Sequence, residues 1–196
     1  LNGPILVGGI PVDVEYISGF GKEGLNIAPR IDGKILISEL ILQNFGMGPG
    51  KEWFSGSSAA FFTLDLPKNK DATFRLTSNL KGLEIRIPEL GWKKNETSLA
   101  NLEVLGHISD RIKYDKLIIS GEGLEVDLRI NNNEKFIIER LVREDILDIS
   151  GAISQNGLEI TGGEVNIANY LKVIDSNGKS KFSTPIFVKL DRLDIT

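Results

Sequence analysis

Few side chains in this sequence have the type and spacing that chemistry requires. There is one histidine, His107, and no cysteine among the 196 residues. A Ser-His-Asp triad would depend on that single imidazole, and no G-x-S-x-G or H-E-x-x-H motif accompanies it. A lone histidine cannot build a multi-histidine metal site. We therefore interpret His107 as a strand-end imidazole with a local hydrogen bond, and we predict no catalytic residue and no metal site.

Two further features match chemical motifs only in part. The glycine-rich stretch Gly46–Lys51 lacks the spacing of a phosphate-binding loop, because Glu52 stands where a Ser or Thr would hold magnesium. Glu125 and Asp127 share one face of a predicted strand, but a glycosidase needs two acids in a cleft, and nothing in the sequence marks one. We interpret this pair as solvated charge. A hydrolase that uses Asp or Glu is a distant alternative, and no cofactor is expected.

The composition excludes several classes of protein. Apolar residues make up 41% of the chain, which is too much for a disordered protein. They never run for about 18 residues, so no membrane-spanning helix is predicted. The net charge is −4, and acidic and basic residues alternate without a basic cluster, so nucleic acid is not an expected partner. The absence of cysteine fits any compartment, a bacterial periplasm included.

The dominant pattern has a period of two, which places alternate residues on one face of a strand. In Leu124–Ile130, four apolar side chains share one face and three charged side chains share the other. Leu83–Ile87, Thr73–Leu80 and Ile186–Asp191 alternate in the same way. Antiparallel sheets with one wet face and one dry face have this pattern.

Turn residues separate these segments. Asp32-Gly33, Asn156-Gly157 and Asn177-Gly178 can adopt the positive φ angles of tight hairpins, and Pro67 and Pro88 stand where strands should end. A Gly-Leu-polar-aliphatic tetrad recurs at unequal intervals, which indicates hairpin after hairpin and not a fixed-period repeat. Its four copies begin at Gly24, Gly82, Gly123 and Gly157.

Helix is expected to be scarce. Ser38–Phe45 could form a helix, but the apolar residues around it are β-prone and occupy both faces, so we interpret this region as a strand covered on both sides; these residues are Ile35, Leu36, Ile37, Ile41 and Leu42. We interpret Ile167–Leu171 as a single helical turn. Phe136–Leu147 stays open: Glu139 and Arg143 are spaced as a helical ion pair, whereas the Phe-Ile-Ile start favours a strand. The aromatic pairs Trp53-Phe54 and Phe61-Phe62 are expected in the core, although such residues also anchor membranes or bind ligands.

Together these patterns predict an all-β fold. We expect an elongated antiparallel meander of amphipathic strands that forms a curved or gutter-like sheet with little helix. Residues 1–196 are expected to form a single β-rich module.

One stretch is more specific than these patterns. Residues 77–94 (TSNLKGLEIRIPELGWKK) carry a Pro-Glu-Leu-Gly-Trp-Lys run, and hydrophobic and glycine spacing is repeated over 117–124, 142–150 and 162–171. This arrangement resembles the AsmA-like family of bacterial envelope proteins over most of residues 60–196, and more weakly over 1–59.

The resemblance implies a section of a longer periplasmic protein, anchored in the inner membrane through parts outside this chain. Such proteins form a β-groove with an apolar interior, which is proposed to carry phospholipids between the membranes and to maintain the outer membrane. The implied partners are a phospholipid or another acyl-chain lipid, neighbouring sections of the same long chain, and membrane proteins at either end. No catalytic residue is implied.

The candidate groove-lining residues are the aliphatic ones on the alternating segments. They are Leu83, Ile85, Ile87, Leu124, Val126, Leu128, Ile130, Leu158, Ile160, Val165 and Ile167. The same alternation also fits a second function, a non-catalytic structural or scaffolding β-domain of the envelope whose apolar face is packed shut. Alternation alone does not separate a dry core from a lipid-filled trough.

Overall fold

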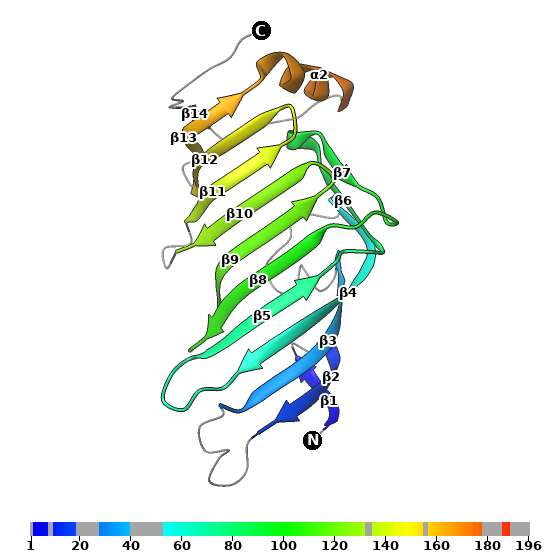
Figure 1. The fold of residues 1–196 in the computed structure, drawn as a ribbon, viewed down its shortest axis with the longest axis vertical. Helices are drawn as coiled ribbons and strands as arrows, with labels where there is room; N and C mark the ends of the chain where they lie inside the picture. The colour runs from blue at the N-terminus through cyan, green and yellow to red at the C-terminus, as the bar shows by residue number, and fades with distance from the viewer. Residues whose placement is uncertain are drawn as a thin grey trace.

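A ladder of strands makes up most of the molecule. The computed structural model describes residues 2–7, 10–18, 28–39, 53–131, 135–154, 157–177 and 186–188. In this part of the chain, 14 strands form one open sheet that is elongated across the strand direction (Figure 1). The predicted all-β, gutter-like meander is therefore confirmed.

Sequential strands are neighbours along almost the whole ladder. Eleven strands pair antiparallel in the order of the following list: β1 Asn2–Val7, β2 Ile10–Ile17, β3 Arg30–Ser38, β4 Phe54–Asp65, β5 Ala72–Ser78, β8 Asn101–Ile108, β9 Ile112–Gly121, β10 Leu124–Ile130, β11 Phe136–Arg143, β12 Leu147–Ser154 and β13 Gly157–Val165. The last strand, β14 (Ile186–Val188), pairs with β13 in parallel, which departs from the purely antiparallel expectation.

Within the described residues, the chain leaves the ladder between β5 and β8, and again between β13 and β14. β6 (Leu83–Ile87), the 3-10 turn η2 (Pro88–Leu90) and β7 (Trp92–Lys94) form a flap, defined as residues 83–94, at one side of the sheet (Figure 1). The first residues of β4 pair with β6, and the later ones pair with β3 and β5. Gly56, with φ of +83°, lies at the point where β4 changes partners. β4 therefore belongs to both the flap and the ladder.

Pairing places alternate residues of every strand on the same face, since directly opposed residues point to the same side of a sheet. Val126, for example, faces Ile119 on β9 and Leu141 on β11. Where one strand has an extra residue, a β-bulge keeps the apolar side chains on the same face. Between Ile138 and Leu141 the register shifts, so the two charged residues Glu139 and Arg140 both face the opposite side. The segment 136–147 is therefore a strand followed by a turn, and the helical alternative for it is wrong.

The described part of the chain has one α-helix, α2 (Ile167–Asn177). Asn166 caps it, because its side-chain Oδ1 accepts a hydrogen bond of 3.0 Å from the backbone N–H of Asn169. The Asn169 side chain also donates to the carbonyl oxygen of Asp145 in the β11–β12 turn. α2 contacts η2, so it lies beside the flap. The helix is longer than the single turn expected from Ile167–Leu171.

Some of the turn predictions are confirmed and one is wrong. Gly82, Gly123 and Gly157 stand at the starts of strands with positive φ angles, as expected. The predicted hairpin at Asp32-Gly33 is wrong, because both residues lie inside β3. Gly33 sits there because the Phe62 ring of β4 covers it and a Cβ would overlap that ring. The residues at Gly24 and the loop 46–51 lie outside the described part.

Other expectations concern exposure and strand ends. Strands end just before both Pro67 and Pro88, as predicted. Phe54 and Phe62 pack against the core, whereas Phe61 is 57% exposed on the opposite face. The interpretation of the β3 region as covered on both sides is wrong, since Leu36 is 58% exposed while Ile35 and Ile37 are buried. The rest of Ile35–Leu42 beyond Glu39 lies outside the described residues.

The attachment of the flap gives the first prediction. Gly82 has φ of +91°, and a Cβ there would overlap the carbonyl oxygen of Ser57, which is backbone and cannot move aside. We expect Gly82→Ala to lower the free energy of unfolding by about 2 kcal/mol or more, as strain at such positions does. Urea unfolding followed by circular dichroism measures this change.

The matched control is Gly3→Ala, because a Cβ at Gly3 meets nothing within 4 Å. This variant should change stability by less than about 0.5 kcal/mol. Equal effects at the two glycines would contradict the close approach of Gly82 to β4.

Candidate functional site

The largest continuous chemical feature is the apolar face of the sheet. The register places aliphatic and aromatic residues, with glycines between some of them, on one face from β2 to β13, so each strand adds to the same face. Representative members, in strand order, are Val14, Ile35, Phe62, Leu76, Val104, Leu117, Leu128, Ile138, Ile149 and Ile160. This set of side chains is called the apolar face below.

The two margins of the apolar face, at the two ends of the strands, differ in solvent exposure. At the ends of the strands next to the flap, Ile37, Leu80, Ala100 and Leu124 are all buried. At the opposite ends of the strands, apolar side chains are 37–40% exposed. These four residues, which define the open margin, are Tyr16 on β2, Ile112 on β9, Phe136 on β11 and Ile153 on β12. The apolar face is therefore closed along one side and accessible along the other.

The flap closes the first margin by filling it with its own side chains. Leu83, Ile85 and Trp92 are at most 5% exposed and belong to one core cluster with residues of the sheet, Leu124 among them. The indole Nε1 of Trp92 donates a hydrogen bond of 3.0 Å to the carbonyl oxygen of Glu122, in the β9–β10 turn. This bond satisfies the polar atom of a buried tryptophan and fixes the flap over the sheet.

The side chain of Lys94 is fully buried in this core. Its side chain faces the sheet next to Ile85, and Nζ donates hydrogen bonds to the carbonyl oxygens of Leu83 (2.8 Å) and Asn95 (3.0 Å). Burial lowers the pKa of Lys94 below its ordinary value of 10.5, and the negative charge of Glu122 raises it in part. Two carbonyl acceptors match the two N–H groups of a neutral amine, so deprotonation leaves both bonds in place.

The structure divides the eleven candidate residues among three environments. Leu83, Ile85 and Ile87 lie on the flap and pack against the core, so they cover the apolar face and do not form its wall. Ile167 begins α2. The remaining candidates lie on the apolar face itself: Leu124, Val126, Leu128 and Ile130 on β10, and Leu158, Ile160 and Val165 on β13. Of these, Leu124 and Ile160 are buried, and the others are partly exposed.

Sequence reasoning missed the four residues of the open margin. Ile112 and Phe136 are the first residues of their strands, and Tyr16 and Ile153 are the last but one, where alternation is too short to assign a face. The available signal was the hairpin register: Phe136 faces Ile130 and Ile153 faces Leu158, and both partners were recognised as apolar-face residues.

The opposite side of the sheet carries the charges and is called the outer face. Across β9 to β12, ion pairs link Lys116 with Asp127 (3.0 Å), Arg129 with Glu139 (3.0 Å), and Arg140 with both Glu125 (3.1 Å) and Asp148 (3.0 Å). Their hydrogen bonds and charges raise the pKa of Lys116 and of Arg140. Glu125 and Asp127 are thus paired surface charges on an open sheet face.

The single histidine lies on the same side. His107 Nδ1 is 3.0 Å from Asp115 Oδ2, which is the local hydrogen bond expected of it. Within the described residues, no group of three His, Cys, Asp or Glu side chains is arranged to hold a metal ion. No described helix is long and apolar enough to cross a membrane.

Comparison with known proteins does not identify the chain. No protein-family model, no curated protein and no solved structure matches it. We therefore infer the function from the residues and the geometry of the apolar face.

The lowered pKa of Lys94 predicts how the stability of the protein changes with pH. The unfolded chain keeps the Lys94 proton up to about pH 10.5, whereas the folded chain releases it at a lower pH. Between these two pKa values the unfolded state binds more protons, so stability contributed at this site rises with pH. We expect the free energy of unfolding of the wild type, relative to Lys94→Met, to increase as the pH approaches 10.5.

Urea unfolding of both proteins between pH 7 and pH 10.5 measures this difference. Lys93→Met is the matched control, because Lys93 is the exposed neighbour on the other face of β7. A difference between wild type and Lys94→Met that does not change with pH would contradict the lowered pKa.

Proposed function

We propose that this chain is a lipid-binding β-groove module, in which the apolar face holds acyl chains along the open margin. The module acts passively, without a catalytic residue or a cofactor, as a section of an AsmA-like envelope protein in the periplasm. Its ligand is a phospholipid or another acyl-chain lipid. The single observation that carries the proposal is an apolar face that continues across the strands and stays accessible at Tyr16, Ile112, Phe136 and Ile153.

The energetics of lipid transfer support this reading. An acyl chain in water costs about 0.8 kcal/mol for each exposed CH₂, so two chains of ordinary length cost on the order of 20 kcal/mol. Only a continuous apolar surface offsets a cost of this size. Since each strand presents similar aliphatic side chains to the same face, neighbouring positions along the ladder are nearly equivalent for a bound chain. Such equivalence favours sliding over tight binding at one place.

The second candidate is a structural or scaffolding β-domain. The flap favours it, because Trp92, Leu83 and Ile85 fill one margin of the apolar face as a closed core does. The open margin favours the groove, because Ile112, Phe136 and Ile153 on β9, β11 and β12 are exposed apolar side chains at the same ends of nearby strands, and gathered exposed apolar side chains often mark a binding surface. The two functions differ in whether a lipid occupies that margin.

An open-margin substitution distinguishes them. Ile112→Asp and Ile153→Asp each place a carboxylate on the open margin, at residues that are 40% and 39% exposed, so folding should be retained. Placing a carboxylate against an acyl chain leaves it without water or a partner. We expect the affinity for cis-parinaric acid, measured by fluorescence, to fall at least tenfold, and co-purified lipid seen by native mass spectrometry to be lost.

The matched control is Thr73→Asp, which adds the same charge at an exposed outer-face position of β5. It should bind the probe as the wild type does. If the wild-type chain neither binds the probe nor retains lipid, the groove proposal is wrong and the scaffold is favoured. If the three variants behave alike, binding occurs away from the open margin.

A further inference from the structure

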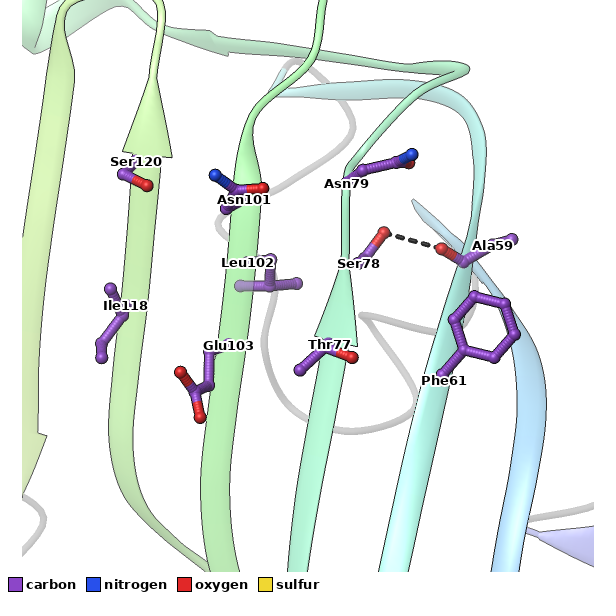
Figure 2. A pocket seen from close by; sticks show the side chains of 10 residues that line it. All are labelled: Ala59, Phe61, Thr77, Ser78, Asn79, Asn101, Leu102, Glu103, Ile118 and Ser120. Carbon is purple, nitrogen blue, oxygen red and sulfur yellow. Dashed lines mark hydrogen bonds between the residues drawn. The ribbon is translucent and has the colours of Figure 1, made fainter.

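The outer face contains a depression that the lipid proposal does not use. It lies where β4, β5, β8 and β9 run side by side, and its volume is about 490 Å³. Figure 2 shows the side chains that line it. Most of them lie on the side of the sheet opposite the apolar face, whereas Ser78 and Leu102 lie on the apolar side. Phe61, Thr77, Asn79, Asn101, Glu103 and Ser120 supply its aromatic and polar groups.

The depression differs from its surroundings in charge. Elsewhere on the outer face, β9 to β12 carry the ion pairs of Lys116, Arg129 and Arg140 described above. In the lining of the depression, Glu103 is the one charged side chain, and its Oε1 already pairs with Nε of Arg75 at 2.6 Å. The remaining polar lining is made of amides and hydroxyls. An anionic ligand would meet Glu103, and a cationic ligand would compete with Arg75.

Several of these polar groups have unused hydrogen-bonding capacity. Among the described residues, the side chains of Thr77, Asn101 and Ser120 make no hydrogen bond. Asn79 uses only its Oδ1, which accepts from the backbone N–H of Lys81 at 3.1 Å, so its amide N–H groups are available. By contrast, Ser78 donates 2.7 Å to the Ala59 carbonyl, the dashed line in Figure 2, and accepts from the backbone N–H of Leu80.

An exposed aromatic ring completes the lining. Phe61 is 57% exposed, and Nζ of Lys34 lies 5.8 Å from its ring centroid. A large aromatic side chain that is held on an exposed sheet face without being buried offers an apolar platform beside the amides and hydroxyls. Figure 2 places this ring next to Ala59 and Thr77 at the edge of the depression.

We propose that the depression binds a neutral sugar unit of an oligosaccharide. Each sugar hydroxyl both donates and accepts hydrogen bonds, and amide and hydroxyl side chains are the groups that do the same in return. The apolar C–H face of a pyranose ring packs on the Phe61 ring. The site is separate from the apolar face, so it stands whether or not the chain binds lipid. Because the depression is open to water, we expect dissociation constants of about 1 mM.

The test is a titration of the ¹⁵N-labelled chain with maltotriose, cellotriose and chitotriose, followed by amide chemical shifts. At least one of the three should cause saturable shifts at the backbone amides of Thr77, Asn101 and Ser120. Asn101→Ala should weaken binding at least fivefold and Phe61→Ala at least tenfold. Both residues are exposed, so these variants should fold. Thr73→Ala, on the outer face beyond the depression, should bind as the wild type does.

Three outcomes overturn the proposal. The first is the absence of saturable shifts with all three sugars. The second is equal binding by the wild type and by Asn101→Ala and Phe61→Ala, which would place the sugar elsewhere. The third is the same pattern of shifts with glycerol at equal hydroxyl concentration, which would show that hydroxyl contact alone, without a ring, is responsible.

Discussion

The separation of apolar and charged side chains onto two faces of one sheet is the constraint on which this structure depends. It requires the register of each strand pair to be correct, because a slip of one residue would move every side chain of a strand to the wrong face. Where the number of residues does not fit, a bulge absorbs the difference. At Glu139 and Arg140 the bulge keeps both charges on the outer face, and at Asp115 a second bulge supplies the partner of His107.

A sheet of this form exposes more apolar surface than a small protein tolerates, and the chain covers part of it locally. The flap is an insertion of twelve residues between two adjacent strands, and it contributes Trp92, Leu83, Ile85 and the stem of Lys94 to the core. α2 lies against η2 at the same side. The opposite margin has no such cover among the described residues. The apolar face is therefore covered asymmetrically: the flap closes one margin, and the other is accessible at Tyr16, Ile112, Phe136 and Ile153.

The two proposed ligands would bind the two faces of the sheet for different physical reasons. The apolar face gains free energy by removing hydrocarbon from water, which needs area and continuity but little geometry. The neutral depression on the outer face offers directional hydrogen bonds instead, and these discriminate by the position of each donor and acceptor. Because the sheet is one layer thick, both surfaces come from alternate residues of the same strands. Phe61 and Phe62 illustrate this, because Phe61 lies on the outer face and its neighbour Phe62 lies on the apolar face.

The sequence by itself determined the strands and which residues of a strand share a face. Leu124–Ile130 and the turns at Gly123 and Gly157 were predictable because period-two alternation and glycine conformation are local properties. The structure that each apolar strand face packs against was not determined by local sequence. Leu83 and Ile85 alternate as Leu124 and Val126 do, yet they belong to a flap that covers the sheet. The flap leaves the ladder where Gly56 and Gly82 have positive φ angles and where the carbonyl of Gly82 accepts a hydrogen bond from the backbone N–H of Ser57. Likewise Asp32-Gly33 resembles a hairpin turn, but the Phe62 ring needs the space that a glycine leaves within β3. Tertiary structure alone decided these points, since they depend on contacts between segments that are distant in the chain.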